Sequence, residues 1–203
     1  GSFSATEVVV GTTLTGRRYR LASVSESVNL ASVGAGGMDV ALAPANGFVA
    51  LYLIFNPTTL DVALLGRDVT SISAAEVYGG ANMPAGYTAS ALVGIIPTNG
   101  SRLMEPHSLK GRSVSVEPVA VLNASSTQRA SLFNLSLAAA IPINAKFVSG
   151  LLTIQSTATS FIAMNVSGGG GKQGQQGVGL SGTGAIAITG SFDDVPTHPS
   201  TPQ

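Results

Sequence analysis

The side chains that could act as catalytic acids, bases or partners of a nucleophile are few and scattered along the chain. Ten residues are acidic and two are histidines. A glycoside hydrolase needs two facing carboxylates about 5–9.5 Å apart, yet the acids here mostly stand singly at expected turns and strand edges. Asp193 and Asp194 are adjacent, so an extended chain points their side chains to opposite faces.

Serine nucleophile chemistry requires a base beside the hydroxyl group. His107 lies in the turn-like segment EPHSLKGR, and His198 lies in a Pro-rich segment where a preorganised site is not expected. The sequence also has no G-x-S-x-G elbow, the sharp turn that presents the serine in one large hydrolase class. We therefore predict that the protein is not an enzyme and has no catalytic residues. A carboxylate pair formed between subunits stays open as an alternative.

Signatures of cofactor and metal sites are weak. Residues 177–182, GVGLSG, match the pattern G-x-G-x-x-G, but that pattern binds a pyrophosphate only between a strand and a helix. Here a Gly-rich tract precedes the match and an expected strand follows it. The chain has no cysteine and two histidines, so a zinc site could form only where copies meet on a symmetry axis. We expect no cofactor and no metal.

The composition narrows the class of partner. Charged residues make up 10% of the chain, the formal net charge is zero and the mean hydropathy is +0.37. Arg17, Arg18 and Arg20 are interpreted as a solvated strand face, so we expect no nucleic-acid partner. No apolar run approaches the roughly 18 residues that a membrane helix needs, so we expect no membrane insertion. High hydropathy with little charge instead indicates surface buried between copies of the chain.

Short runs of β-branched, aliphatic and aromatic residues recur along the chain, separated by Gly, Pro, Asn and Ser. This pattern predicts an all-β fold, and we expect an antiparallel, jelly-roll-like β-sandwich. The expected strands cover residues 7–10, 17–24, 38–43, 47–55, 61–65, 87–96, 112–122, 131–137, 147–155, 160–166 and 185–189. Single helical turns are expected at residues 73–78 and 135–140. The run 48–55 is apolar on both faces, so we expect one face to pack against a neighbouring subunit.

Changes in composition divide the chain into three parts. Residues 1–22 are interpreted as an N-terminal shaft or linker segment, and residues 23–167 as the β-sandwich domain. From residue 168 the sequence GGGGKQGQQGVGLSGTG has almost no apolar content, which is typical of a flexible loop. A final strand and a Pro-rich tail complete the third part, residues 168–203.

Recognition of a surface ligand is expected from polar and aromatic loop residues. One candidate receptor-binding group lies in the loop AEVYGGANMPAGY and consists of Tyr78, Asn82 and Tyr87. The second group lies in the Gly-rich tract and consists of Lys172, Gln173, Gln175 and Gln176. Both groups have an alternative interpretation: the tyrosines pack their loop against the domain, and the tract is a mobile loop that binds nothing.

Two motifs carry a resemblance to a known protein family. NPTT at residues 56–59 directly follows the apolar run GFVALYLIF, and MPAGY at residues 83–87 begins another strand. Over about residues 22–166, this order of turns and strands resembles tail-fibre proteins of bacterial viruses and prophages. The chain departs from the family after PAGYT, where the sequence ASALVG lacks the basic residues often found there.

The resemblance implies a homotrimeric, non-enzymatic tail-fibre module, with subunits intertwined or side by side. Such a module is located on the virion and is therefore extracellular. Its partners would be further copies of itself, other tail proteins, and a bacterial surface polysaccharide or outer-membrane receptor. A purely structural connector of the virion and a surface-polysaccharide depolymerase are the alternatives that the sequence leaves open.

Overall fold

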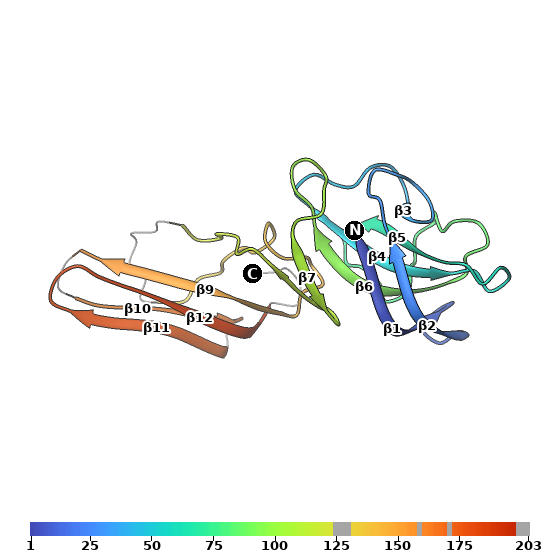
Figure 1. Ribbon diagram of the computed structural model, residues 1–203. Helices are drawn as coiled ribbons and strands as arrows, with labels where there is room; N and C mark the ends of the chain where they lie inside the picture. Colours follow the sequence, from blue (N-terminus) through green and yellow to red (C-terminus); the bar gives the residue numbers. More distant parts are fainter. Residues whose placement is uncertain (124–130, 158–159, 170–171, 198–203) are drawn as a thin grey trace. The chain divides into compact units, whose positions relative to one another are not determined.

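The computed structural model describes residues 1–123, 131–157, 160–169 and 172–197 (Figure 1). These residues contain twelve β-strands and no helix. Every ladder between strands is antiparallel except the one that joins β3 to β5. The predicted all-β, mainly antiparallel fold is therefore confirmed, whereas residues 73–78 and 135–140 contain bends and turns instead of helical turns.

The chain divides into two compact units, Gly1–Glu117 and Pro118–Gln203. Unit 1 is built on one six-stranded sheet with the strand order β2-β1-β6-β4-β5-β3. Its strands are β1 (Ser2–Gly11), β2 (Arg18–Ser27), β3 (Gly37–Met38), β4 (Phe48–Phe55), β5 (Val62–Asp68) and β6 (Ala89–Pro97). A separate hairpin pairs β7 (His107–Lys110) with β8 (Ser113–Val116), so the strands expected at 38–43 and 112–122 are much shorter than predicted.

The segment predicted as a shaft, residues 1–22, belongs to the sheet of unit 1. β1 pairs with β2 from Ser2 opposite Ser27 to Gly11 opposite Arg18, and it meets β6 where Gly11 faces Ser90. The inward side chains of this hairpin join the core of the unit. The boundary between the two compact units lies after residue 117.

The central strand β4 is buried at all eight of its residues. Leu51 and Leu53 lie in one apolar cluster with side chains of β1, β2 and β5. Because β1 and β2 contribute to this cluster, their hairpin must fold over β4 and β5. Tyr52 and Ile54 lie in a second cluster, which the segment between β5 and β6 covers with side chains that include Tyr78. Unit 1 therefore covers both faces of β4 itself, and the expectation of a neighbouring subunit on one face is wrong.

Unit 2 consists of two antiparallel ladders, visible as paired arrows in Figure 1. β9 (Phe147–Ser156) pairs with β12 (Ile186–Pro196), and β10 (Ser160–Gly168) pairs with β11 (Gln173–Gly182). The tract predicted as a flexible loop thus contains β11, and the first residues of the predicted tail belong to β12. Residues 198–203 of that tail, with His198, lie outside the described residues, and residues 131–137 form no strand.

The glycines of β11 fit the close approach of its partner strand. Residues 176–180, QGVGL, alternate glycine with larger residues, which is the period of a strand. At Gly177 an added Cβ would lie 2.6 Å from the carbonyl oxygen of Met164 on β10. The high glycine content predicts flexibility, but at Gly177 it reflects a strand position without room for a side chain.

Unit 2 buries few apolar side chains. Among its described residues, Leu152 and Val195 are the only buried hydrophobic ones, against twenty-five in unit 1. Phe147, Leu151 and Phe161 are 60%, 59% and 74% exposed. Unit 2 therefore exposes more large apolar side chains than it buries in its core.

Candidate functional site

The two turn motifs of unit 1 pack directly against each other. Asn56 is 8% exposed, and its Oδ1 accepts hydrogen bonds from the backbone N–H groups of Thr58 at 3.0 Å and Thr59 at 3.4 Å. The N–H of Leu60 donates to the Asn56 carbonyl at 2.8 Å. Gly86 of the second motif has φ +84°, and an added Cβ would lie 2.6 Å from Asn56 Nδ2. The motifs therefore form one cluster of turns with a structural role.

Tyr78, a predicted receptor-binding residue, is 7% exposed. Its hydroxyl donates to Asp39 Oδ2 at 2.8 Å, and the Asp39 carboxylate is itself buried. The Tyr78 ring lies edge-on to Tyr52 with centroids 5.4 Å apart, and Arg67 Cζ lies 5.6 Å from its centroid. Burial, followed by Asp39, raises the pKa of Tyr78 to about 12. This geometry supports the packing interpretation, in which Tyr78 anchors the segment between β5 and β6.

Asn82 and Tyr87 belong to the same segment but differ in surroundings. Asn82 is exposed, and its backbone is hydrogen-bonded to Tyr78. Tyr87 is half-buried against the second apolar cluster. Burial, followed by the charges of Asp61 and Glu26, raises the pKa of the Tyr87 phenol. Two carboxylates from different elements are therefore near Tyr87, one from β2 and one from the turn before β5.

The second predicted group lies at the start of β11 in unit 2. Lys172, Gln173 and Gln175 are exposed, whereas Gln176 is half-buried. The Gln176 Oε1 accepts a hydrogen bond from the Asp193 N–H at 3.0 Å, and its Nε2 donates to the Asp193 carbonyl. Gln176 therefore joins β11 to β12 in the way a backbone amide would. The two predicted groups lie in different units.

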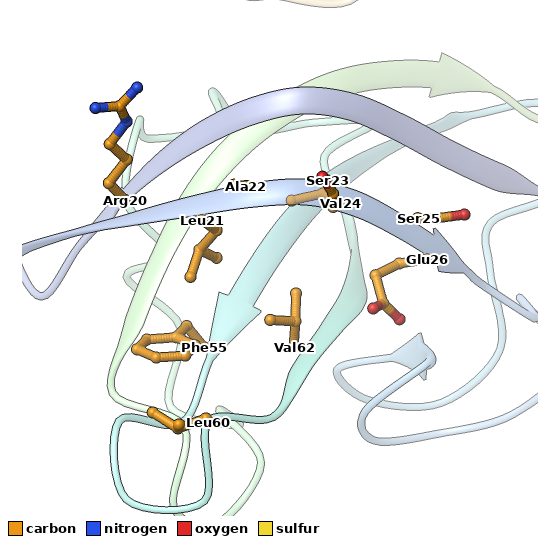
Figure 2. A pocket seen from close by; sticks show the side chains of 10 residues that line it. All are labelled: Arg20, Leu21, Ala22, Ser23, Val24, Ser25, Glu26, Phe55, Leu60 and Val62. Atoms are coloured by element: carbon orange, nitrogen blue, oxygen red, sulfur yellow. The ribbon is translucent and has the colours of Figure 1, made fainter.

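A groove of about 410 Å³ runs along β2 in unit 1 (Figure 2). Seven consecutive residues of β2, Arg20 to Glu26, line it. Successive side chains of a strand point to opposite faces, so a groove lined by consecutive residues follows the edge of the strand. Phe55 and Val62 form the opposite wall, and Figure 2 shows Leu21 above them, whereas Arg20 points away.

Two residues of the groove have the left-handed backbone conformation that favours glycine. Ser23 has φ +53° and Leu60 has φ +65°. Exposed and less exposed residues alternate along β2 until Ser23, where the alternation shifts by one residue. After this shift Glu26 lies among the less exposed residues, and Figure 2 shows its carboxylate pointing down beside β5. Leu60 is the more unusual of the two, because its side chain is also 70% exposed.

Ion pairs determine which charges remain available at the groove. Arg20 is paired with Glu7 of β1, on the side away from the groove. Glu26 is therefore the charged side chain that faces the groove, and Asp61 lies in the turn beside it.

Elsewhere in unit 1, Arg112 Nη1 donates to Glu76 Oε1 at 2.6 Å. This pair lowers the pKa of Glu76 and raises that of Arg112.

The groove was not predicted from the sequence. The expected exposure of the basic cluster at the start of β2 is confirmed for Arg18 and Arg20, but the sequence around it does not predict a binding surface. The signal that could have found the groove is Leu60, a large apolar residue in the turn segment that begins with NPTT, where Gly, Asn, Asp or Ser is usual. Nothing in the sequence marks the conformation of Ser23.

The chemistry available at the groove is binding chemistry: backbone hydrogen-bonding groups, an aliphatic wall and a carboxylate. In the described part of the chain, no three His, Cys, Asp or Glu residues gather in a way that could hold a metal ion. Nor does that part contain a helix long and apolar enough to cross a membrane. Comparisons of the chain with protein-family models, with curated proteins and with solved structures find no match.

Proposed function

We propose that the chain is a non-enzymatic module of a phage-like tail fibre that assembles as a homotrimer. On the virion it would join other tail proteins and attach the particle to a bacterial surface polysaccharide or an outer-membrane receptor. The resemblance in the two turn motifs supports this proposal, and so does the burial pattern of unit 2. For unit 1 we propose a jelly-roll-like sandwich, because the β1–β2 hairpin folds over β4 and β5 around one apolar cluster.

The burial of unit 2 is the observation that carries the proposal. Two-stranded ladders are marginally stable in water unless another layer covers their apolar face. The strands β9, β11 and β12 largely alternate exposed with half-buried residues, and Leu152 and Val195 are the only buried hydrophobic side chains described there. Within one chain β11 packs against β12, so the half-buried rows face the other ladder, but Phe147, Leu151 and Phe161 stay exposed to solvent. We expect neighbouring copies to cover them, as in an obligate homo-oligomer.

The charge distribution of unit 2 also suits association between copies. Its described charged side chains lie near the end of the ladders where β9 begins and β12 ends: Lys146, Lys172, Asp193 and Asp194. The remaining length of both ladders is uncharged, so copies can lie side by side without like-charge repulsion. At the charged end, lysines of one copy can meet aspartates of the next.

Light scattering on the purified chain tests the assembly. Three chains of 20.3 kDa give a mass of about 61 kDa. Phe161→Asp places a charge on β10 at a position 74% exposed in one chain, and Leu14→Asp makes the same change at a 65% exposed position of unit 1. We expect Phe161→Asp to lower the mass towards that of one chain and Leu14→Asp to leave it unchanged. A monomeric wild-type protein would refute the proposal.

Attachment needs a separate assay, because assembly alone also fits a structural connector. The trimer is incubated with envelope fractions from a panel of bacteria, and the bound protein is measured by co-sedimentation. Three linked copies turn weak single-site binding into firm attachment, so we expect saturable binding to some envelopes and none to others. A trimer that binds no envelope would be a connector, and release of new reducing ends would indicate a depolymerase. Either result contradicts the attachment role.

A further inference from the structure

We infer that the outer edge of β2 binds an extended segment of another protein that contains lysine or arginine. The bound segment would add to the sheet of unit 1 as a further strand. This inference goes beyond the attachment role and does not depend on it, because it rests on unit 1 alone. Three features of the groove carry it: an unpaired backbone edge, an aliphatic wall and an acidic end.

β2 is a ten-residue strand at the edge of its sheet. β1 pairs with one side of it from Arg18 to Ser27. Within the described residues, no backbone hydrogen bond from another element reaches the other side of this strand. The opposite edge of the sheet is formed by β3, which has two residues. A long edge strand with free N–H and C=O groups is a template for strand addition.

The shape of the groove determines where the added strand lies. The turn before β5 and the first residue of β5 form the far wall, so an incoming strand lies across the mouth of the groove and directs alternate side chains into it. Leu21, Leu60 and Val62 offer these side chains an aliphatic surface. The Phe55 ring is 5% exposed and packs 5.1 Å from the Tyr19 ring, so it presents no open face for stacking a sugar. The wall therefore favours a polypeptide over a glycan.

The charges at the groove favour a basic ligand. Glu26 faces the groove, and Asp61 lies beside Leu60 in the turn that forms its wall. Arg20 is engaged by Glu7 and points away from the groove. Asp61 Oδ2 accepts a hydrogen bond from Thr59 Oγ1 at 2.6 Å, so Glu26 is the carboxylate that a lysine or arginine of the incoming strand meets first. An acidic segment would be repelled.

The conformation of Leu60 also agrees with a binding role. Leucine in the left-handed region is strained, and exposure of most of its side chain leaves that strain without the gain of burial. Outliers of this kind occur preferentially at ligand-binding positions. A bound aliphatic side chain would cover Leu60 and account for its presence at the rim of the groove.

The experiment measures binding of a fluorescent, end-blocked octapeptide to the full chain by anisotropy. Its odd positions are threonine and its even positions are valine, valine, lysine and lysine, so that one face of the strand carries both aliphatic and basic side chains. Three comparison peptides are used. One carries glutamate in place of lysine, and the other two carry N-methyl groups on every second residue, one in each of the two possible phases. We expect saturable binding of the lysine peptide and at least tenfold weaker binding of the glutamate peptide. Only one N-methylation phase should abolish binding, because an added strand uses one of its edges. Equal effects of both phases would overturn strand addition.

Matched protein variants locate the site. Glu26→Gln removes the charge that faces the groove, and Glu105→Gln removes an acid of unit 1 that lies outside it and is half-buried, as Glu26 is. We expect the first to weaken lysine-peptide binding five- to tenfold and the second to change it less than twofold. Hydrogen exchange gives an independent readout, in which the peptide should slow exchange of amides in β2. Unchanged exchange in β2, or equal effects of the two variants, contradicts the site.

Two other occupants would give different results. If a glycan fills the groove, an oligosaccharide of N-acetylglucosamine will displace the lysine peptide. If the β2 edge pairs with a second copy of the chain, saturating peptide will lower the mass measured by light scattering. Either outcome overturns the inference, and neither bears on whether the trimer binds bacterial envelopes.

Discussion

Replacing Tyr78 by phenylalanine removes one hydroxyl from the interior of unit 1 and tests what holds its long β5–β6 segment. The lost bond is the 2.8 Å donation to Asp39, a carboxylate that is 8% exposed. Hydrogen bonds to charged groups contribute about 1.5–3 kcal/mol. The variant leaves Asp39 with Arg67 as its charged partner, whose Nε is 4.0 Å away. We therefore expect Tyr78→Phe to lower the free energy of unfolding by about 2 kcal/mol at pH 7.

The same hydroxyl predicts how this difference changes with pH. The pKa of Tyr78 is about 12 in the folded chain and about 10 when unfolded. Because the folded state holds the proton more tightly, its contribution is complete below about pH 10 and is lost as the pH rises to about 12. A shift of about two pKa units corresponds to about 3 kcal/mol. The phenylalanine variant lacks this titration, so its deficit should shrink above pH 10.

Urea unfolding, followed by circular dichroism at equal chain concentration, measures both effects. Tyr19→Phe is the matched control, since Tyr19 is half-buried and its described contact is the ring of Phe55. We expect it to change stability by less than about 0.5 kcal/mol. The reasoning fails if Tyr78→Phe does the same at pH 7, or if its deficit is equal at pH 7 and pH 11.

Three further substitutions have outcomes that urea midpoints can check. Gly86→Ala should lower stability by about 2 kcal/mol or more, because φ is +84° and the new Cβ would lie 2.6 Å from the buried side-chain amide of Asn56. Gly79→Ala is its control and should not destabilise the protein, because no atom lies within 4 Å of the new Cβ. Arg112→Ala should cost at most about 1 kcal/mol, and 1 M salt should remove the difference, because its pair with Glu76 is exposed. Leu60→Asn should raise stability by about 0.5–1 kcal/mol, because asparagine tolerates the left-handed region, while it weakens lysine-peptide binding. Equal midpoints for the two glycine variants, or a less stable asparagine variant, would show that backbone conformation is not the cause.

The best-predicted part of the fold is the centre of unit 1. The strands expected at 47–55 and 87–96 differ by one or two residues from Phe48–Phe55 and Ala89–Pro97. Long apolar runs that end in Asn-Pro or begin after Pro-Ala-Gly leave little freedom in where a strand begins or ends. The first half of β1, SFSAT, is not predicted because small polar residues have weak strand propensity. It is a strand because β2 pairs with it, and this pairing cannot be read from the residues of β1 alone.

The candidate site was harder to predict because its features depend on neighbours in space. Tyr78 and Tyr87 were chosen as aromatic residues in a loop, and only the fold shows that one is buried beside Asp39 and the other lies near Glu26 and Asp61. That β2 lies at the edge of the sheet depends on strand order, which a single strand's sequence does not specify. The residue types predicted a binding site in the tyrosine-containing loop between β5 and β6. The groove lies along β2 instead, and it depends on the strand order and on the positive φ angles of Ser23 and Leu60.

The apolar side chains of the two units are covered in different ways, so assembly and peptide binding can be tested by separate substitutions. In unit 1 the doubly apolar β4 is covered from within, so its hydrophobicity is no argument for an oligomer. In unit 2 the large side chains of Phe147, Leu151 and Phe161 stay exposed, so the argument for association rests there. Phe161→Asp should therefore abolish the trimer and preserve peptide binding per chain, whereas Glu26→Gln should weaken peptide binding five- to tenfold and preserve the trimer. Loss of both properties in Phe161→Asp would mean that the groove exists only in the assembled protein, and loss of both in Glu26→Gln would mean that assembly uses the groove.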